Sequence, residues 1–96
     1  MLIETPYKEG DTISLKLASG EEIVARLDKE EQDVLVLTKP LVLIAQGEGL
    51  GLAPFMFSVS PDSKFNMRLS AVSCIVKTEG EIAKQYTAQT TGIQMV

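Results

Sequence analysis

The feature that most constrains the fold is an alternation of apolar and polar residues on both sides of a short turn. Every second residue from Thr12 to Leu17 is apolar, and a similar pattern returns from Glu22 to Leu27. A period of two is typical of half-buried strands. Gly20 lies between the two runs and adopts the positive φ of a tight turn without steric cost. The sequence therefore predicts a β-hairpin whose core-facing residues are Ile13, Leu15, Leu17, Ile23, Ala25 and Leu27.

A strongly acidic segment separates this hairpin from the next apolar run. Asp28–Asp33 contains four acids and one lysine, so it cannot be buried and is predicted to be a solvated loop. Val34–Thr38 is apolar without alternation, which favours a strand covered on both faces. Pro40 has no N–H to donate, so the run through Ile44 must bend, bulge or lie at an edge there. One long bent strand and two shorter strands both fit this pattern.

Glycines and prolines divide the middle of the chain. Gly47–Gly51 has glycine at every second position. Phosphate-binding loops lead directly into a helix, whereas this segment leads into Ala53–Phe55, so a mobile loop is the preferred interpretation. Phe55–Ser60 alternates again and is predicted to be a strand that ends at the turn sequence Pro61–Ser63.

The last long strand is predicted within Asn66–Lys77. One face of it is assigned Leu69, Ala71, Ser73 and Ile75, and the other face Val72, Cys74 and Val76. Cys74 is the only cysteine and has no obvious basic neighbour, so it is interpreted as an inert buried thiol. A disulfide within the chain and a multi-cysteine metal site are thereby excluded.

A short helix is predicted after this strand. Thr78 and Glu81 have the T-x-x-E spacing of a capping box. Ile82 and Tyr86 then lie on one face of the helix as i, i+4 neighbours. The fold class is therefore all-β: a small, strongly bent antiparallel sheet or open SH3-like barrel of roughly five to six strands, with a short C-terminal helix. At 96 residues we expect a single domain, with an N-terminal segment (1–11), a barrel (12–77), a helix (78–92) and a frayed tail (93–96).

The amino-acid composition excludes several classes of function. The chain has no histidine, which excludes the Ser-His-Asp triad and every zinc site that uses histidine. We expect no catalytic residues, no metal site and no cofactor. The net charge of -4 argues against non-specific coating of a nucleic-acid duplex. No stretch is apolar enough for a membrane span or a signal peptide, so we expect a cytoplasmic protein with no membrane partner.

The hairpin resembles the first motif of the Sm-like family, which includes the Sm and LSm proteins and bacterial Hfq. That motif has Leu-x-x-Gly followed by apolar-x-Gly-x-Leu. Here Leu17, Gly20, Ile23 and Leu27 match it, while Ala25 replaces the second glycine. The segment 71–76 resembles the family's last strand. The chain also resembles divergent Sm-like proteins attributed to cyanophages, which implies a phage setting in a host cytoplasm.

The departures from the family pattern concern its nucleic-acid site. Family members carry an Asp-x-x-x-Asn loop after the second strand, whose Asn reads a base. This chain has Glu31–Leu35 at that place, and neither the Asn nor a stacking residue is matched. The connection 47–64 is longer than the family's. The family's N-terminal helix is missing or reduced to Leu2–Tyr7.

The resemblance implies a ring of roughly five to seven copies, closed by strand-edge pairing, that holds single-stranded RNA or DNA near its pore. Apolar residues make up 45% of the chain, which is more than we expect one small core to bury. A ring would bury part of this apolar surface and would also pair free strand edges. The predicted function is a non-catalytic scaffold or chaperone in nucleic-acid processing. The predicted nucleic-acid-binding residues are Arg68, Lys64, Phe65, Asn66, Lys29 and Gln32.

Two other functions stay open at this stage. An oligomeric structural or adaptor protein without nucleic-acid binding, again in a phage setting, fits the acidic charge and the altered loop. A monomeric barrel that holds a small apolar ligand would require a cavity that the sequence cannot reveal.

Overall fold

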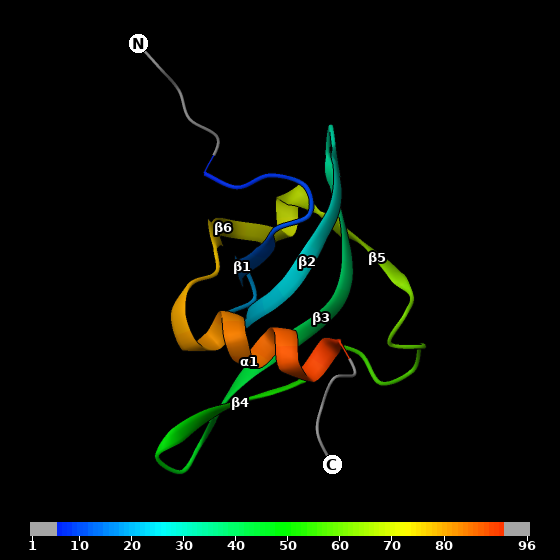
Figure 1. Cartoon of the computed structure of the whole chain (residues 1–96). Helices are drawn as coiled ribbons and strands as arrows, with labels where there is room; N and C mark the ends of the chain where they lie inside the picture. Colours follow the sequence, from blue (N-terminus) through cyan, green and yellow to red (C-terminus); the bar gives the residue numbers. More distant parts are fainter. Residues whose placement is uncertain (1–5, 92–96) are drawn as a thin grey trace.

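The structure is a computed structural model, and it describes residues 6–91. Within this range six strands form one bent antiparallel sheet, and one α-helix lies against it (Figure 1). The elements are β1 (Thr12–Leu17), β2 (Glu22–Glu31), β3 (Val34–Gln46), β4 (Gly49–Pro54), β5 (Lys64–Arg68), the 3-10 turn η1 (Leu69–Ala71), β6 (Val72–Lys77) and α1 (Gly80–Thr90). The strand order is β4-β3-β2-β1-β6, and β5 pairs with the first half of β3. The predicted fold class is confirmed.

The hairpin of β1 and β2 supplies most of the core. Its register pairs Ile13 with Ala25 and Leu15 with Ile23, so the alternating apolar residues of both strands share one face. Gly20 has a φ of +112°, as the predicted turn requires. The buried cluster consists of Ile13, Leu15, Leu17, Ile23, Ala25, Leu27, Leu35 and Leu37.

β3 is one long strand that bends at Lys39 and Pro40. Lys39 has a φ of +50°, a left-handed conformation that non-glycine residues seldom adopt. Pro40 cannot donate a ladder hydrogen bond. Before the bend β3 pairs with β5, and after it with β4. Of the two predicted alternatives, the single bent strand is therefore the one observed.

The acidic segment Asp28–Asp33 is not the predicted loop. β2 continues through Glu31, and only Gln32 and Asp33 form the turn to β3. The segment is solvent-exposed as expected. It is nevertheless extended, because the backbone of Lys29–Glu31 pairs with that of Val34–Val36. Figure 1 shows this hairpin tip projecting beyond the sheet, so its side chains remain in water while its backbone is paired.

Two expectations for the middle of the chain are wrong. Gly47–Gly51 is not a loop throughout: residues 47–48 form a turn, and β4 starts at Gly49. Phe55–Ser60 is not a strand, because residues 55–63 form a loop that ends in the predicted turn at 61–62. The cause is the bend in β3, where Lys39 and Pro40 leave no regular strand for residues 55–60 to pair with.

The predicted strand within Asn66–Lys77 is interrupted. β5 ends at Arg68, η1 follows, and β6 begins at Val72. A β-bulge changes the phase of the alternation within β6, because Val72 pairs with Leu17 and Cys74 pairs with the adjacent Lys16. Val72 and Ile75 therefore both pack against the core, although the sequence assigns them to opposite faces. Cys74 is exposed, which corrects its interpretation as a buried thiol. Its strand neighbour on β1 is Lys16.

Helix α1 forms, but without the predicted capping box. Thr78 N–H donates to the Thr12 carbonyl at 3.0 Å, and the Thr78 and Ser14 hydroxyl oxygens lie 2.8 Å apart. Thr78 therefore extends the pairing of β6 with β1 instead of capping the helix. Glu79 occupies the N-cap position without a side-chain hydrogen bond. The helix spans 80–90 within the predicted 78–92, and the predicted tail 93–96 lies outside the described residues.

Tyr86 attaches the helix to the bend of β3. Its side chain is buried, and its hydroxyl donates to the carbonyls of Lys39 at 2.8 Å and Thr38 at 3.1 Å. Burial raises the pKa of Tyr86 to about 12, although the nearby Arg26 opposes this shift. Residues 6–11 contain no helix, and Leu2–Thr5, the rest of the segment proposed as a reduced N-terminal helix, lies outside the described residues.

Candidate nucleic-acid interface

Strand β5 presents three of the predicted binding residues on one face. Lys64, Asn66 and Arg68 alternate along the strand and are all exposed. Phe65 lies between them on the opposite face, where it is half-buried and packs against the core. The strand therefore separates the polar candidates from the aromatic one.

The other two candidates, Lys29 and Gln32, are related to β5 only through the intervening strand β3. Val36 pairs with Lys29 on one side and with Asn66 on the other, and Val34 pairs with Arg68. Gln32 belongs to the turn that joins β2 and β3. We call the outer part of the β2–β3 hairpin the hairpin tip (residues 29–36). Lys29 and Gln32 belong to it, Asn66 and Arg68 pair with it, and Lys64 pairs with the nearby Thr38.

Acidic neighbours accompany two of the three cations. Lys64 Nζ lies 3.1 Å from Asp28 Oδ2, and Lys29 Nζ lies 3.4 Å from Glu31 Oε2. These pairs are exposed, so each contributes little to stability and exchanges readily for another anion. Within residues 6–91, by contrast, the Arg68 guanidinium makes no hydrogen bond or ion pair. Arg68 is the cation best placed to meet a phosphate.

The N-terminal segment adds further acidic groups to the hairpin tip. Glu30 N–H donates to Glu9 Oε2 at 3.0 Å, and the Tyr7 hydroxyl donates to Glu30 Oε2 at 3.4 Å. Partial burial and the Glu30 charge raise the pKa of Tyr7. The part of the tip next to residues 7–9 therefore carries acidic groups, whereas Lys64 and Arg68 lie on β5.

The structure also exposes an aromatic residue that the sequence reasoning missed. Phe57 is 84% exposed and lies in the loop 55–63. Its alternation with Phe55 and Val59 assigned it to a strand, and nothing local in the sequence distinguishes it from a core residue. Phe65, the aromatic selected from the sequence, instead has a core contact.

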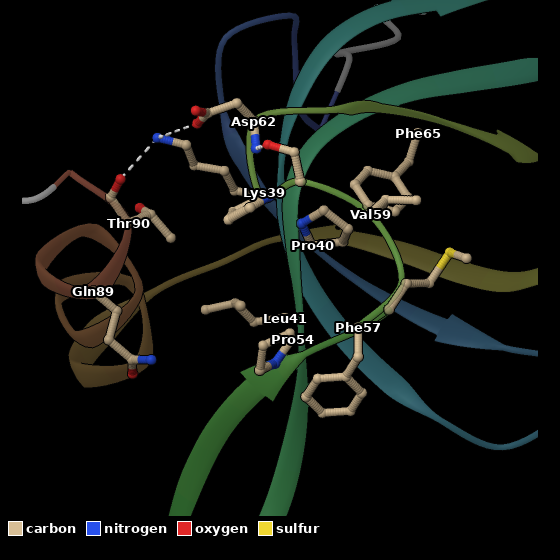
Figure 2. A pocket seen from close by; sticks show the side chains of 13 residues that line it. Lys39, Pro40, Leu41, Pro54, Phe57, Val59, Asp62, Phe65, Gln89 and Thr90 are labelled. Atoms are coloured by element: carbon tan, nitrogen blue, oxygen red, sulfur yellow. Dashed lines mark hydrogen bonds and ion pairs between the residues drawn. The ribbon is translucent and has the colours of Figure 1, made fainter.

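A pocket of about 550 Å³ opens between this loop, the bend of β3 and the last turn of α1 (Figure 2). Its apolar lining consists of Pro40, Leu41, Pro54, Met56, Phe57, Val59, Pro61 and Phe65. Lys39 and Asp62 are its charged lining residues. Lys39 Nζ donates to the Thr90 carbonyl at 2.8 Å and lies 3.9 Å from Asp62 Oδ1, so these contacts connect the loop to the helix.

The described part of the chain shows no group of three or more His, Cys, Asp or Glu residues arranged to hold a metal ion. No helix in residues 6–91 is long and apolar enough to cross a membrane. The groups that the described residues offer for binding are hydrogen-bonding side chains, cations and free strand edges.

Comparison with known proteins identifies the type of fold. No protein-family model matches the sequence, and no curated protein is significantly similar to it. Among solved structures, the chain is similar to the P. aerophilum SmAP1 heptamer, with a TM-score of 0.53 and 19% sequence identity. The match covers 75% of this chain and 84% of that chain. The fold is therefore Sm-like.

Proposed function

We propose that copies of this Sm-like chain close into a ring and that the ring binds single-stranded RNA or DNA beside the hairpin tip, without catalysing a reaction. The observation that carries the ring is the set of free strand edges. In the described chain β6 pairs only with β1, and β4 and β5 each pair only with β3. One edge of each strand is left to pair with another chain.

Two different free edges favour a head-to-tail contact. Pairing β5 of one copy with β6 of the next is heterologous, and such contacts generate rings when the rotation closes. The exposed apolar side chain of Val76 on β6 would then gain cover from the neighbouring copy. The heptameric state of the SmAP1 structure is consistent with this arrangement.

Nucleic-acid binding is supported by the position of Arg68. Its guanidinium has no partner among residues 6–91. Asn66 shares its face of β5, and the register pairs Arg68 with Val34, two residues from Gln32. A cation and amides suit phosphates and base edges. A ring repeats this weak site once per copy, which multiplies its effect on one long ligand. The chain would act in a cytoplasm, that of a host cell if it is phage-encoded.

A second candidate function is an oligomeric structural or adaptor protein that binds no nucleic acid. The specific observation for it is electrostatic: Lys29 and Lys64 already have acidic partners, and the net charge is -4. Such a ring would present the hairpin tips to a protein instead.

The first experiment is the native mass, measured by light scattering coupled to size exclusion over a tenfold concentration range. We expect a constant mass that corresponds to whole rings of roughly five to seven copies each. A monomer at every concentration would remove the ring and favour the small-ligand barrel.

The second experiment separates the two functions through salt dependence. We expect a single-stranded RNA oligonucleotide to bind with an affinity that falls as salt rises, and Arg68→Ala to weaken binding and reduce the salt slope. Lys84→Ala is the matched control, because Lys84 is an exposed cation on α1 paired with Glu81. An absence of binding even at low salt would leave the adaptor function.

A further inference from the structure

The pocket under loop 55–63 combines a hollow and a protruding side chain on one surface. The hollow of about 550 Å³ has mainly apolar walls, among them Leu41 and Val59. Phe57 lines the same pocket and yet is 84% exposed (Figure 2). An exposed aromatic side chain beside an open apolar pocket is typical of a protein–protein contact. Aromatic side chains that fill pockets often contribute most of the binding free energy of such contacts.

The chemistry of the surface favours a second copy of this chain as the occupant. A protrusion and a hollow on one surface complement themselves under a two-fold rotation, so that each Phe57 enters the other copy's pocket. The charged lining residues are one cation and one anion, Lys39 and Asp62. The same rotation can bring Lys39 of one copy near Asp62 of the other. A nucleic acid fits less well, because these two charges cancel and leave no net positive charge for phosphates.

We propose that Phe57 and this pocket form a two-fold contact that joins two rings of the chain face to face. The proposal rests on the ring of the proposed function and uses neither the β5 nor the β6 edge. Each phenylalanine buries roughly 150–250 Å², and a stable interface needs about 1,200 Å² or more in total. One such contact is too small to hold two monomers together. Two rings make one contact per subunit simultaneously, and this multivalency supplies the missing affinity.

The test is the native mass of three variants beside the wild-type chain. We expect the wild type to have twice the mass of one ring and Phe57→Ser to have half the wild-type mass. Leu50→Ser is the matched control, because Leu50 is an apolar residue that is 52% exposed and lies on β4 away from the pocket lining. We expect it to keep the wild-type mass. Phe57 is exposed, so unchanged unfolding midpoints will confirm that Phe57→Ser still folds.

The third variant, Asp62→Lys, tests the charge pairing. It places a second cation opposite Lys39 of the facing ring, so we expect a shift toward single rings at low salt that added salt reduces. If the wild type is a single ring, or if Phe57→Ser leaves a double ring intact, the Phe57 contact is overturned and the ring is not. If the wild type is a monomer, the ring and the Phe57 contact are both overturned. A Phe57-dependent dimer without larger species removes the ring and overturns the proposal that the contact joins two rings.

Discussion

Gly20 shows how one backbone angle fixes the first hairpin. Its φ of +112° lies outside the region that residues with a Cβ adopt readily. No atom lies within 4 Å of the place where its Cβ would stand, so the cost of a larger residue comes from the backbone and not from a clash. The Gly20 N–H donates to the Leu17 carbonyl at 2.9 Å, which closes the turn.

We therefore predict that Gly20→Val lowers the free energy of unfolding by about 1–3 kcal/mol. Gly49→Val is the matched control, since Gly49 also has open space around its Cβ position but no positive φ. A β-branched residue suits that position in β4, so its effect should be small. Denaturant unfolding of the two variants checks this. Equal stabilities would contradict the assignment of strain to Gly20.

Tyr86 gives stability a dependence on alkaline pH. Burial raises its pKa to about 12, above the ordinary tyrosine pKa of 10.0. The folded state therefore holds the phenolic proton more tightly than the unfolded state does. Its contribution to stability is complete below pH 10 and declines as the pH rises from about 10 through about 12. Ionisation also removes the hydrogen bonds to the Thr38 and Lys39 carbonyls.

Tyr86→Phe should therefore be less stable than the wild type at neutral pH, and the difference should shrink as the pH approaches 12. Denaturant unfolding at several pH values measures this. Comparison with the wild type cancels the titration of the lysines, which both proteins share. A stability difference that stays constant up to pH 12 would contradict the role assigned to this hydroxyl.

At the scale of elements, local pattern predicts a strand only where a partner strand is available. The alternation of 12–27 predicted β1 and β2 correctly because these strands pair with each other across a short turn. Residues 29–31 lack any apolar pattern but are extended, because Val34–Val36 pairs with them. Phe55–Ser60 has the pattern but not the structure, because the opposite part of β3 is bent at Pro40. For residues 29–31 and 55–60 alike, pairing with another segment, and not the local pattern, determines whether the residues form a strand.

The same distinction applies to the candidate site. The shared face of Lys64, Asn66 and Arg68 follows from their spacing within one strand. Their proximity to Lys29 and Gln32 depends on the pairing of β5 with β3, which no local pattern indicates. The pocket beside Phe57 depends on a loop that contacts the C-terminal turn of α1 through Lys39 and Asp62, and it has no signature in the sequence.

Thr78 connects two elements, and its substitution tests that connection. The Thr78 hydroxyl lies 2.8 Å from that of Ser14 on β1. We predict that Thr78→Val costs about 1 kcal/mol of unfolding free energy and that Thr78→Ser, which keeps the hydroxyl, costs less. In a double-mutant cycle, Ser14→Ala should remove most of the additional cost of Thr78→Val. Independent effects of the two changes would contradict a bond between them, and a loss of helical signal alone would favour the capping box.

At the scale of the whole molecule, the sheet has ends that a single copy leaves unpaired. The barrel is open, with β6 at one end of the strand order and β4 and β5 at the other. Apolar residues stay exposed on these strands, among them Val76 and Leu50. An open sheet with exposed apolar edges is prone to associate. In the proposed ring, the edge that a neighbour covers is β6, and the distal part of β4 is left free.

Val76→Lys tests this assignment, because a lysine on an edge strand opposes strand pairing between chains. Val76 is 55% exposed, so the change should leave the unfolding free energy of one copy nearly unaltered while lowering the native mass to that of a monomer. Leu50→Lys, at 52% exposure on β4, should keep the ring. The monomer should also bind RNA more weakly than the ring, although Arg68 is intact, because affinity for a long strand depends on the repeated site. If Val76→Lys retains the full mass and Leu50→Lys loses it, the ring closes through β4, and the head-to-tail contact must be reassigned to that edge.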